Sequence, residues 1–362
     1  MKDAIRSLLL WVCVGGRLLA QAQTTELSTT QPAADHAPPY TDRSYITLGD
    51  GTFSVDVLLP DAATGHYRGP RFIHGGMVAQ VRIQTSGGPQ EFLAQCTTRD
   101  DPTAFDANAV GLAEEFSTPL GYEDVFPSET DPAPSFVKIG IGSLGRNTTK
   151  DYAFSRPYPI LFSAPWAVVK SDTAASFTQS HTHPTGYGYL YTVGIITDTK
   201  ARSLRIKRSL SNTGTRTITT RHYSHHFFGL HPRSTPVGPG YRLTMKGPAR
   251  LDPNSTLATS SKSTQQHDQL TVELVSPVPE RRSLSSPILD MAPSSLRNFV
   301  LSYATASDGR TSSRIEFSTD SELQAGYIWL NSLAFCPETF TSISLRPGEQ
   351  LNWSSQYVFS TR

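Results

Sequence analysis

Three short segments of the chain bring together residue types that can carry out acid/base chemistry. They are residues 67–76 (Tyr-Arg-Gly-Pro-Arg-Phe-Ile-His-Gly-Gly), 223–228 (Tyr-Ser-His-His-Phe-Phe) and 335–340 (Phe-Cys-Pro-Glu-Thr-Phe). A histidine and a glutamate can form a general acid/base pair, and the planar guanidinium of an arginine can hold hydroxyls or a carboxylate. The aromatic rings can stack on sugar rings. Each segment alone is also consistent with an ordinary strand, but the three together favour a site that acts on a carbohydrate.

The middle of the chain is rich in histidine. Six of the ten histidines are His181, His183, His222, His225, His226 and His231. Because residues two apart on a strand share a face, His181 and His183 should converge, whereas His225 and His226 should point in opposite directions. The metal-binding spacings HExxH and CxxC are absent, so we expect no bound metal. No Walker loop, GxSxG elbow or strand-linked GxGxxG occurs, which argues against nucleotide binding.

The elements that must position these residues are predicted to be strands. From Tyr45 onward, short runs of β-branched and aromatic residues alternate with turn residues, at 53–59, 77–83, 136–141, 187–196, 203–210 and 217–223. In one run Leu204, Ile206 and Arg208 point one way, and the residues between them the other. The turn-like residues 211–215 predict a hairpin over 203–223. Only residues 109–116 and 294–299 could form a helical turn or two, so we expect one large antiparallel β domain.

Several charged residues beside these runs allow two interpretations. Glu114, Glu115 and Glu123 lie near glycines, where carboxylates can do acid/base work, but a solvated loop is the favoured interpretation. Lys138 is expected to point outward from a strand rather than line a pocket. Cys96 and Cys336 could form a disulfide that anchors the segment of Glu338, and the spacing does not show whether they meet.

The composition and the N-terminus indicate an exported globular protein. The chain has 362 residues with 32 Lys and Arg against 31 Asp and Glu, which argues against a nucleic-acid groove. Residues 1–22 resemble a signal peptide with basic residues, an apolar stretch and an Ala-Gln-Ala end. Residues 23–44 are predicted to be a flexible leader and 45–362 the folded domain. No apolar run is long enough to span a membrane, which argues against an integral membrane protein. Because of the predicted signal peptide, we expect export to the periplasm or the exterior.

The three segments resemble motifs of the aldose 1-epimerase (galactose mutarotase) superfamily. Residues 224–228 are similar to that family's Asn-His-x-Tyr-Phe motif, in which the histidine is the general acid, and this places the role on His225. Residues 73–76 resemble its Leu-His-Gly-Gly segment, whose histidine contacts the sugar, and this places that role on His74. Glu338 occupies the C-terminal position of the family's catalytic base, and Arg71 would be its sugar-binding arginine.

The resemblance extends to a divergent branch of the superfamily over about residues 45–360. It is carried by Tyr-Arg-Gly-x-Arg-Phe (67–72), by residues 114–122 and 136–140, and by Ser-Leu-x-Asn-Thr-Gly (209–214). The implied fold is a large antiparallel β-supersandwich in a single domain. The family also has a sugar-contacting aspartate, for which Asp252, Asp268 and Asp290 are the candidates.

The implied reaction is the interconversion of the anomers of a mono- or oligosaccharide without a metal or organic cofactor. His225 would protonate the ring oxygen, Glu338 would remove the anomeric hydroxyl proton, and His74 with Arg71 would orient the sugar. The same fold also supports polysaccharide lyases and glycoside hydrolases. The side chains that could bind the substrate of such an enzyme are Arg68, Arg71, His183, Tyr187, Tyr189 and Tyr191. A non-catalytic carbohydrate-binding protein is the third alternative. The oligomeric state is left open.

Overall fold

The structure of the protein is a computed structural model that describes residues 44–361 except 95–103, 107, 132, 267, 293–296 and 305–310. The predicted signal peptide, residues 23–43 of the predicted leader, and Cys96 lie outside the described residues. Among the residues described, no helix has the length and apolar composition needed to cross a membrane.

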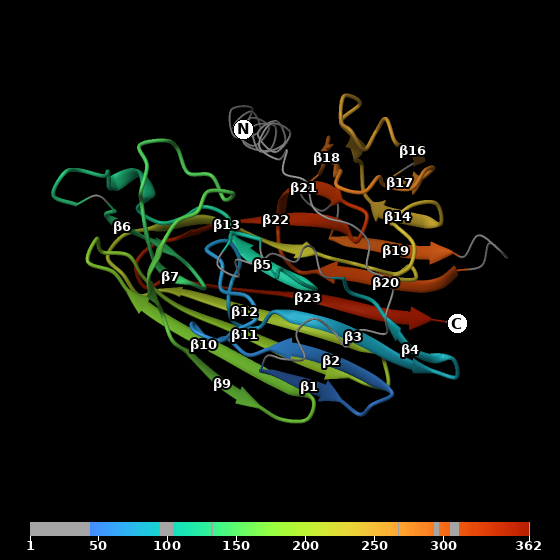
Figure 1. Cartoon of the computed structure of the whole chain (residues 1–362), viewed down its shortest axis with the longest axis horizontal. Coiled ribbons are helices and arrows are strands. Elements are labelled where there is room, and N and C mark those ends of the chain that lie inside the picture. Colours follow the sequence, from blue (N-terminus) through green and yellow to red (C-terminus); the bar gives the residue numbers. More distant parts are fainter. Residues whose placement is uncertain are drawn as a thin grey trace, which may run out of the picture.

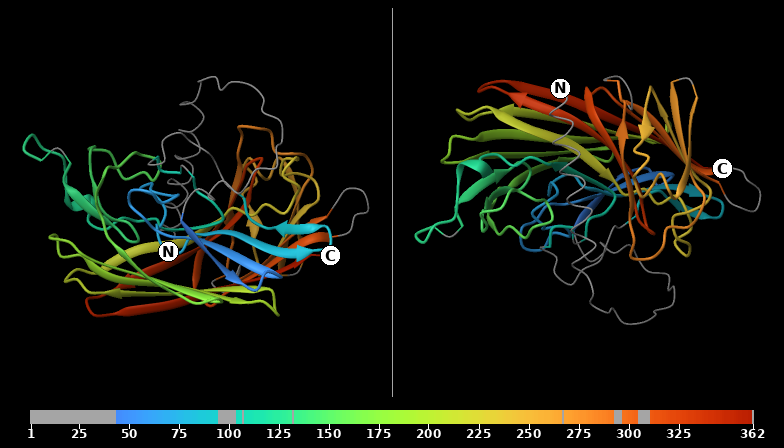
Figure 2. Two further views of the ribbon diagram at one scale, coloured as in Figure 1. Left: turned by 60° about the horizontal axis from the view of Figure 1, so that its bottom comes forward. Right: turned by 90° about the horizontal axis from the view of Figure 1, so that it is seen from above.

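Two large antiparallel sheets lie face to face, and a small third sheet sits at one end (Figure 1, Figure 2). Apart from the short 3₁₀ turn η1 (Tyr122–Asp124), the regular structure of the described residues consists of β-strands. The predicted all-β class and the predicted sandwich of antiparallel sheets are therefore confirmed.

The first large sheet carries the segments that the motifs singled out. Within the described residues it has ten strands, with β4 (Gly88–Glu91) paired to β3 outside the main order. The order is β1 (Tyr45–Gly49), β2 (Phe53–Leu58), β3 (Val78–Thr85), β5 (Leu112–Phe116), β13 (Ile218–His226), β22 (Phe335–Leu345), β21 (Leu323–Leu330), β18 (Leu284–Leu289) and β15 (Arg250–Leu251).

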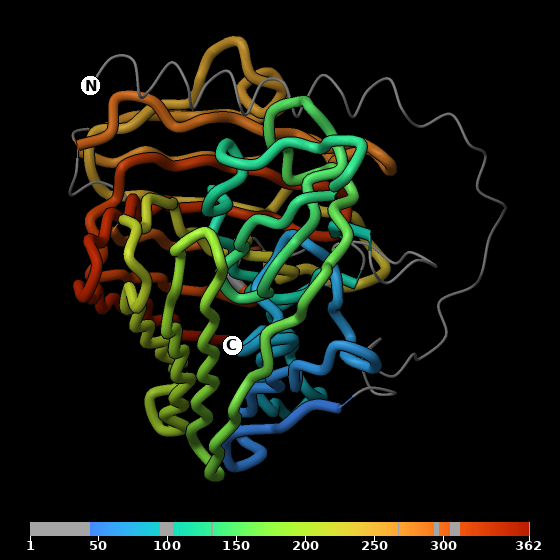
Figure 3. The backbone as a smooth tube through the Cα atoms, turned by 90° about the vertical axis from the view of Figure 1, so that its left-hand side faces the viewer, coloured from blue at the N-terminus to red at the C-terminus, as the bar shows by residue number. Residues whose placement is uncertain are grey.

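The second large sheet also has ten strands among the described residues. Its order is β16 (Ser261–Gln266), β17 (Gln269–Leu274), β14 (Tyr241–Lys246), β19 (Asn298–Ala304), β20 (Thr311–Thr319), β23 (Gln350–Thr361), β12 (Ser203–Asn212), β11 (Gly188–Asp198), β10 (Ala174–Thr182) and β9 (Trp166–Lys170). The small sheet consists of β6 (Ser135–Lys138), β7 (Gly142–Gly145) and β8 (Ile160–Ser163). The green chain of this small sheet continues into β9, the edge strand of the second large sheet (Figure 3).

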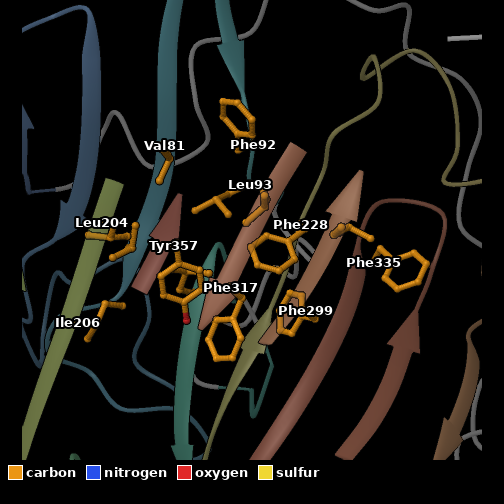
Figure 4. Packing of buried hydrophobic residues seen from close by; sticks show 14 of the residues in the cluster. Val81, Phe92, Leu93, Leu204, Ile206, Phe228, Phe299, Phe317, Phe335 and Tyr357 are labelled. Atoms are coloured by element: carbon orange, nitrogen blue, oxygen red, sulfur yellow. The ribbon is translucent and has the colours of Figure 1, made fainter. Parts of the chain in front are cut away.

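The main hydrophobic core lies between the two large sheets. In β12, Leu204 and Ile206 are buried whereas Arg205 is exposed, which confirms the alternation predicted for this strand. Figure 4 shows how side chains from strands far apart in the sequence meet in this core, with the rings of Phe317 and Tyr357 5.2 Å apart. The core thus determines which face of each strand points inward. The outer face of the first sheet does not take part in this core.

The predicted hairpin over residues 203–223 is wrong. Strand β12 pairs with β11 and β23 in the second sheet, while β13 pairs with β5 and β22 in the first sheet. Residues 213–217, which include part of the predicted turn, therefore carry the chain from one sheet to the other. A turn-like sequence specifies a local reversal, but the partner of each strand is decided by long-range packing.

The helical turn considered for residues 109–116 is also wrong, because residues 112–116 form the strand β5. Gly111 precedes this strand with a φ of 62°, and a Cβ atom added there would lie 1.9 Å from the carbonyl oxygen of Val78. Glycine is needed for both the left-handed backbone and the close approach. This contact sets β5 against β3, and β5 in turn positions two glutamates.

Candidate active site

The candidate site lies on the outer face of the first sheet, where β5, β13 and β22 run side by side (Figure 1). Because side chains alternate along a strand, Tyr223 and His225 project from the same face of β13. Tyr223 is opposite Glu115 of β5 in the strand register, and His225 is opposite Ala113. Glu338 of β22 approaches His225 from the other side.

His225 and Glu338 form a buried pair, as their motifs predicted they could. Nε2 of His225 lies 3.1 Å from Oε1 of Glu338, and each residue is 5% exposed. The ring of Phe227 stacks on His225 at 4.2 Å, and the rings of Phe72 and Trp329 meet it edge-on at 5.9 and 5.2 Å. The pair is therefore enclosed largely by apolar rings.

This apolar enclosure decides where the proton of the pair resides. Burial raises the pKa of Glu338 to about 8 and lowers the pKa of His225 well below its usual value. At neutral pH Glu338 therefore holds the proton and can donate it to Nε2 of His225. Nδ1 of His225 is also buried, and it has no hydrogen-bond partner among the described residues. The pair can thus exchange one proton internally, and it has one further buried polar atom without a hydrogen-bond partner among the described residues.

Glu115 is the centre of a second group of buried side chains beside the pair. Its carboxylate accepts hydrogen bonds from Nζ of Lys138 at 2.8 Å, from Nε of Arg71 at 3.0 Å and from the hydroxyl of Tyr223 at 2.5 Å. Arg71 also donates to the Tyr223 hydroxyl at 2.8 Å, and Lys138 donates to that of Tyr152 at 2.9 Å. This group is called the Glu115 network below.

The Glu115 network balances large and opposing electrostatic effects. Burial disfavours the carboxylate of Glu115, but Lys138 and Arg71 more than offset this and hold its pKa below the usual value. Burial lowers the pKa of Lys138, although Glu115 favours its charged form. Two cations face one carboxylate, so the network has an excess of positive charge beside the His225–Glu338 pair.

The loop of residues 67–76 places Arg71 in this network. The hydroxyl of Tyr67 accepts hydrogen bonds from the backbone N–H groups of Arg71 and Phe72 at 3.2 and 2.9 Å, and it donates to the Phe105 carbonyl at 2.7 Å. The backbone N–H of Ile73 then donates to the Glu114 carbonyl at 2.8 Å, which ties the loop to β5. Arg71 is thus held in place from both its backbone and its side chain.

His74 and Arg68 lie on the same loop but contact other groups. Nε2 of His74 is 2.9 Å from the Gly69 carbonyl oxygen, and its ring reaches His225 only indirectly, through the rings of Tyr67 and Phe72. Arg68 donates to the carbonyl oxygen of Ala63 in the preceding turn. The structure therefore brings Arg71, but neither His74 nor Arg68, to the side of the pair.

His183 and Tyr189 are placed elsewhere in the fold. His183 makes hydrogen-bonding contacts with the hydroxyls of Ser135 and Thr185 in a surface groove, and its ring converges with that of His181, as predicted, at 6.0 Å. Tyr189 is fully buried, and its hydroxyl donates to Oε1 of Gln179 at 2.6 Å. His183 is therefore a residue of the surface groove, and Tyr189 is a residue of the core.

The three candidate aspartates lie in surface turns or at strand ends. Asp252 accepts a hydrogen bond from the backbone N–H of Asn254, and Asp290 is exposed and paired with Arg250. Asp268 is exposed beside β17. In the part of the chain that the structure describes, these aspartates do not contact His225 or Glu338.

The expectation that Glu114, Glu115 and Lys138 are solvated is wrong, whereas Glu123 is exposed as expected. Glu114 and Glu115 are 6% and 1% exposed and Lys138 is completely buried. The sequence held one signal of this: Lys138 and the two glutamates stand inside apolar runs, Phe-Val-Lys-Ile and Leu-Ala-Glu-Glu-Phe. A charge within such a run needs a buried partner.

A rim of partly exposed aromatic rings surrounds these side chains. Phe154 lies over the guanidinium of Arg71 at 4.1 Å, Phe340 stacks on Tyr223 at 4.5 Å, and Trp329 borders His225. Phe154 and Trp329 come from segments that the motifs did not include. The rim offers flat apolar faces next to hydrogen-bonding groups, which is the combination that suits a sugar ring.

No family model matches the chain, and a search of curated proteins finds no relative. Solved structures with the same fold are found. The Slr1438 protein from Synechocystis sp. PCC 6803 has a TM-score of 0.52 and 15% identity, covering 94% of this chain and all of that chain. The GalM/aldose epimerase homologue from C. elegans has a TM-score of 0.51 and 11% identity, covering 88% and 99%. The galactose mutarotase related enzyme from Lactobacillus acidophilus has a TM-score of 0.50 and 11% identity, covering 88% and 98%.

These comparisons establish the fold class. The chain has the galactose mutarotase-like β-sandwich fold, and the superfamily resemblance stated from the motifs is confirmed at the level of the fold.

Proposed function

We propose that the protein is a carbohydrate-active enzyme of the aldose 1-epimerase type, which interconverts the anomers of a sugar. The observation that carries the proposal is the buried contact of His225 with Glu338, 3.1 Å apart. Burial raises the pKa of Glu338 and lowers that of His225, so we infer that the pair holds one proton at neutral pH. The aromatic rim and the neighbouring Arg71 support a sugar as the substrate. The export predicted from residues 1–22 would make the substrate a periplasmic or extracellular sugar.

One proton on the pair is what anomer exchange requires. Opening the ring needs a proton delivered to the ring oxygen and another removed from the anomeric hydroxyl, and closing the ring on the other face reverses both transfers. One member of the pair gives its proton while the other takes one, so the total on the pair is unchanged. After closure the pair has returned to its starting state.

His225 can serve as the acid in ring opening once the proton has crossed from Glu338. In the empty site burial keeps that proton on Glu338. Sugar hydroxyls that enter the enclosure would hydrogen-bond to the carboxylate and lower its pKa, and the proton would then move to Nε2 of His225 across the 3.1 Å contact. Glu338 becomes the base, in agreement with the roles expected from the motifs. Arg71, held by Glu115 and Tyr223, would orient the sugar from the side.

A polysaccharide lyase is the second candidate, and the positive charge of the Glu115 network favours it. Arg71 and Lys138 share one carboxylate. Their excess charge could neutralise the carboxylate of a uronate, whose C5 proton His225 would then remove. This candidate predicts an anionic polymer as the substrate and unsaturated products.

The test follows anomer exchange directly. Purified protein would be mixed with freshly dissolved α-glucose, α-galactose or oligosaccharides, and the α and β signals would be recorded by proton NMR over time. We expect accelerated exchange that is abolished in Glu338→Gln and in His225→Gln. Glu316→Gln, an exposed glutamate on β20, is the matched control and should exchange at the wild-type rate.

Each result separates the candidates. Acceleration that survives both Glu338→Gln and His225→Gln would refute the pair as the reacting groups. No exchange with sugars, together with unsaturated products from polyuronates, would replace the epimerase proposal with the lyase. No turnover on either class would refute both enzyme proposals and leave a carbohydrate-binding protein.

A further inference from the structure

A groove of about 570 Å³ lies between the small sheet and the end of β10, away from the His225–Glu338 pair. Ser135 of β6 and Ser143 of β7 line one side of it, and Phe162 of β8 lies beside them. His181 of β10 and His183, the first residue after β10, line the other side. Side chains alternate along β6, so Ser135 lies on the face of the small sheet opposite to Lys138. Lys138 belongs to the Glu115 network. The groove and the Glu115 network therefore use opposite faces of β6.

The polar groups of the groove are arranged in pairs of hydroxyl and imidazole. The Ser143 hydroxyl lies 2.9 Å from Nε2 of His181, and the Ser135 hydroxyl lies 2.9 Å from Nε2 of His183. Nδ1 of His183 is 2.7 Å from the Thr185 hydroxyl. Burial lowers the pKa of both histidines, so they are neutral at physiological pH. The groove residues include no Asp, Glu, Lys or Arg.

An aromatic ring stands exposed beside these pairs. The ring of Phe162 is stacked on His181, with the ring centres 5.4 Å apart and 23° between the planes. This contact occupies one face of the ring, yet the residue remains 50% exposed, and its neighbour Leu161 is 53% exposed. A half-exposed phenylalanine next to hydroxyls provides an apolar platform within reach of hydrogen-bonding groups.

We infer that this groove is a second binding site, which holds a neutral oligosaccharide with one sugar ring on Phe162 and its hydroxyls on the serine–histidine pairs. The carbohydrate class rests on the proposed function, but the site does not depend on catalysis at Glu338. The lack of charge disfavours a uronate or a phosphorylated sugar. A metal ion is disfavoured because both Nε2 atoms already contact hydroxyls and because, among the described residues, no three His, Cys, Asp or Glu side chains converge.

Two sites of this kind have a functional consequence. The groove would hold the body of a chain on one face of the small sheet, while a free reducing end on the same or a neighbouring chain reaches the pair. Holding a polymer at a second site raises the effective concentration of its ends at the first.

The test measures binding to the full chain carrying Glu338→Gln, so that turnover does not change the ligand. Neutral hexasaccharides with β-1,4-, β-1,3- or α-1,4-linked glucose, and an oligogalacturonate for comparison, would be titrated by calorimetry. Phe162→Ala removes the platform, and Ser143→Ala removes one hydroxyl. Phe126→Ala is the matched control, because Phe126 is 56% exposed and lies against Arg146 outside the groove.

We expect a neutral hexasaccharide to bind, and Phe162→Ala to weaken its binding roughly fivefold. This corresponds to about 1 kcal/mol for a stacked ring, since tenfold equals about 1.4 kcal/mol. Ser143→Ala should weaken binding less, and Phe126→Ala should leave it unchanged. The inference is overturned if no neutral chain binds, if Phe162→Ala binds like its parent, or if Phe162→Ala instead converts a dimer into a monomer in sedimentation. Groove binding without anomer exchange would refute the proposed function alone, and exchange without groove binding would refute this inference alone.

Discussion

Replacing Glu338 with glutamine should remove a specific pH dependence of stability. The side chain is buried against apolar rings and holds a proton at neutral pH, so an uncharged amide of nearly the same shape can take its place. The amide N–H can donate to Nε2 of His225 as the protonated carboxyl does. We therefore expect Glu338→Gln to fold, and to differ from the parent mainly in what happens as the pH rises.

The size of the effect follows from the number of protons bound. In the native state the pKa of Glu338 is raised from 4.5 to about 8 and that of His225 is lowered well below 6.5, whereas the unfolded chain titrates at the ordinary values. At slightly acidic pH both states hold one proton on these two groups, the native state on Glu338 and the unfolded chain on the histidine, so they add little pH dependence there. Above pH 6.5 the native pair keeps its proton and the unfolded pair has none, so stability falls with rising pH. The loss is about 1.36 kcal/mol per pH unit, or about 2 kcal/mol by pH 8.

Urea-unfolding curves at pH 6.5 and pH 8 measure this loss. The free energy of unfolding of the parent should fall by about 2 kcal/mol more than that of Glu338→Gln over this interval, because contributions from all other groups cancel in the difference. Glu316→Gln, at an exposed position, should follow the parent. If the parent and Glu338→Gln change in parallel, Glu338 is ionised in the native protein and the reasoning about the pair is refuted.

Three further predictions address the site and the fold. The rate of anomer exchange should fall above about pH 8, because the pair then has no proton to deliver; a rate that still rises at pH 9 would contradict this. Glu115→Gln should destabilise the protein by about 3 kcal/mol or more, since it leaves the buried cations of Lys138 and Arg71 without their carboxylate. Lys138→Met should destabilise it clearly less, because Arg71 still balances the charge of Glu115. If thermal unfolding shows the reverse order, the charge balance described for the network is contradicted. Gly111→Ala should lower the free energy of unfolding by about 2 kcal/mol or more, because it strains the backbone and contacts a carbonyl of β3; a midpoint in urea equal to that of the parent would show that β5 can shift.

Local patterns in the sequence were sufficient to predict several of the strands but not their partners. The alternation in β12 identified which side chains would be buried, because one face of a strand in a sandwich must meet the core. The predicted hairpin of β12 and β13 failed because a turn signal is the same whether the chain reverses within a sheet or passes to the other sheet. The strand β5 was missed because its two adjacent glutamates break the apolar alternation expected of a half-buried strand.

For the site, the motifs located His225 and Glu338, 113 residues apart, and the structure brings them into contact. The Glu115 network could not be found in this way. Its members Arg71, Lys138 and Tyr223 lie 44, 23 and 108 residues from Glu115 in the sequence. Burying each of these charged or polar groups would be costly without the others as partners. A single sequence shows the charges but not which of them meet.

The structure also explains why Glu338, rather than another buried glutamate of the same sheet, is the group that can exchange a proton. Glu114 and Glu115 are adjacent in β5 and point to opposite faces, and both are as buried as Glu338. Burial raises the pKa of all three, but Arg208 reverses this for Glu114, and Lys138 with Arg71 reverses it for Glu115. Both carboxylates are therefore permanently charged near neutral pH and hold the sheet and the loop together. Glu338 faces an imidazole and aromatic rings instead of a direct cation partner, so its pKa stays near 8, and of the three it alone can give and take a proton under physiological conditions.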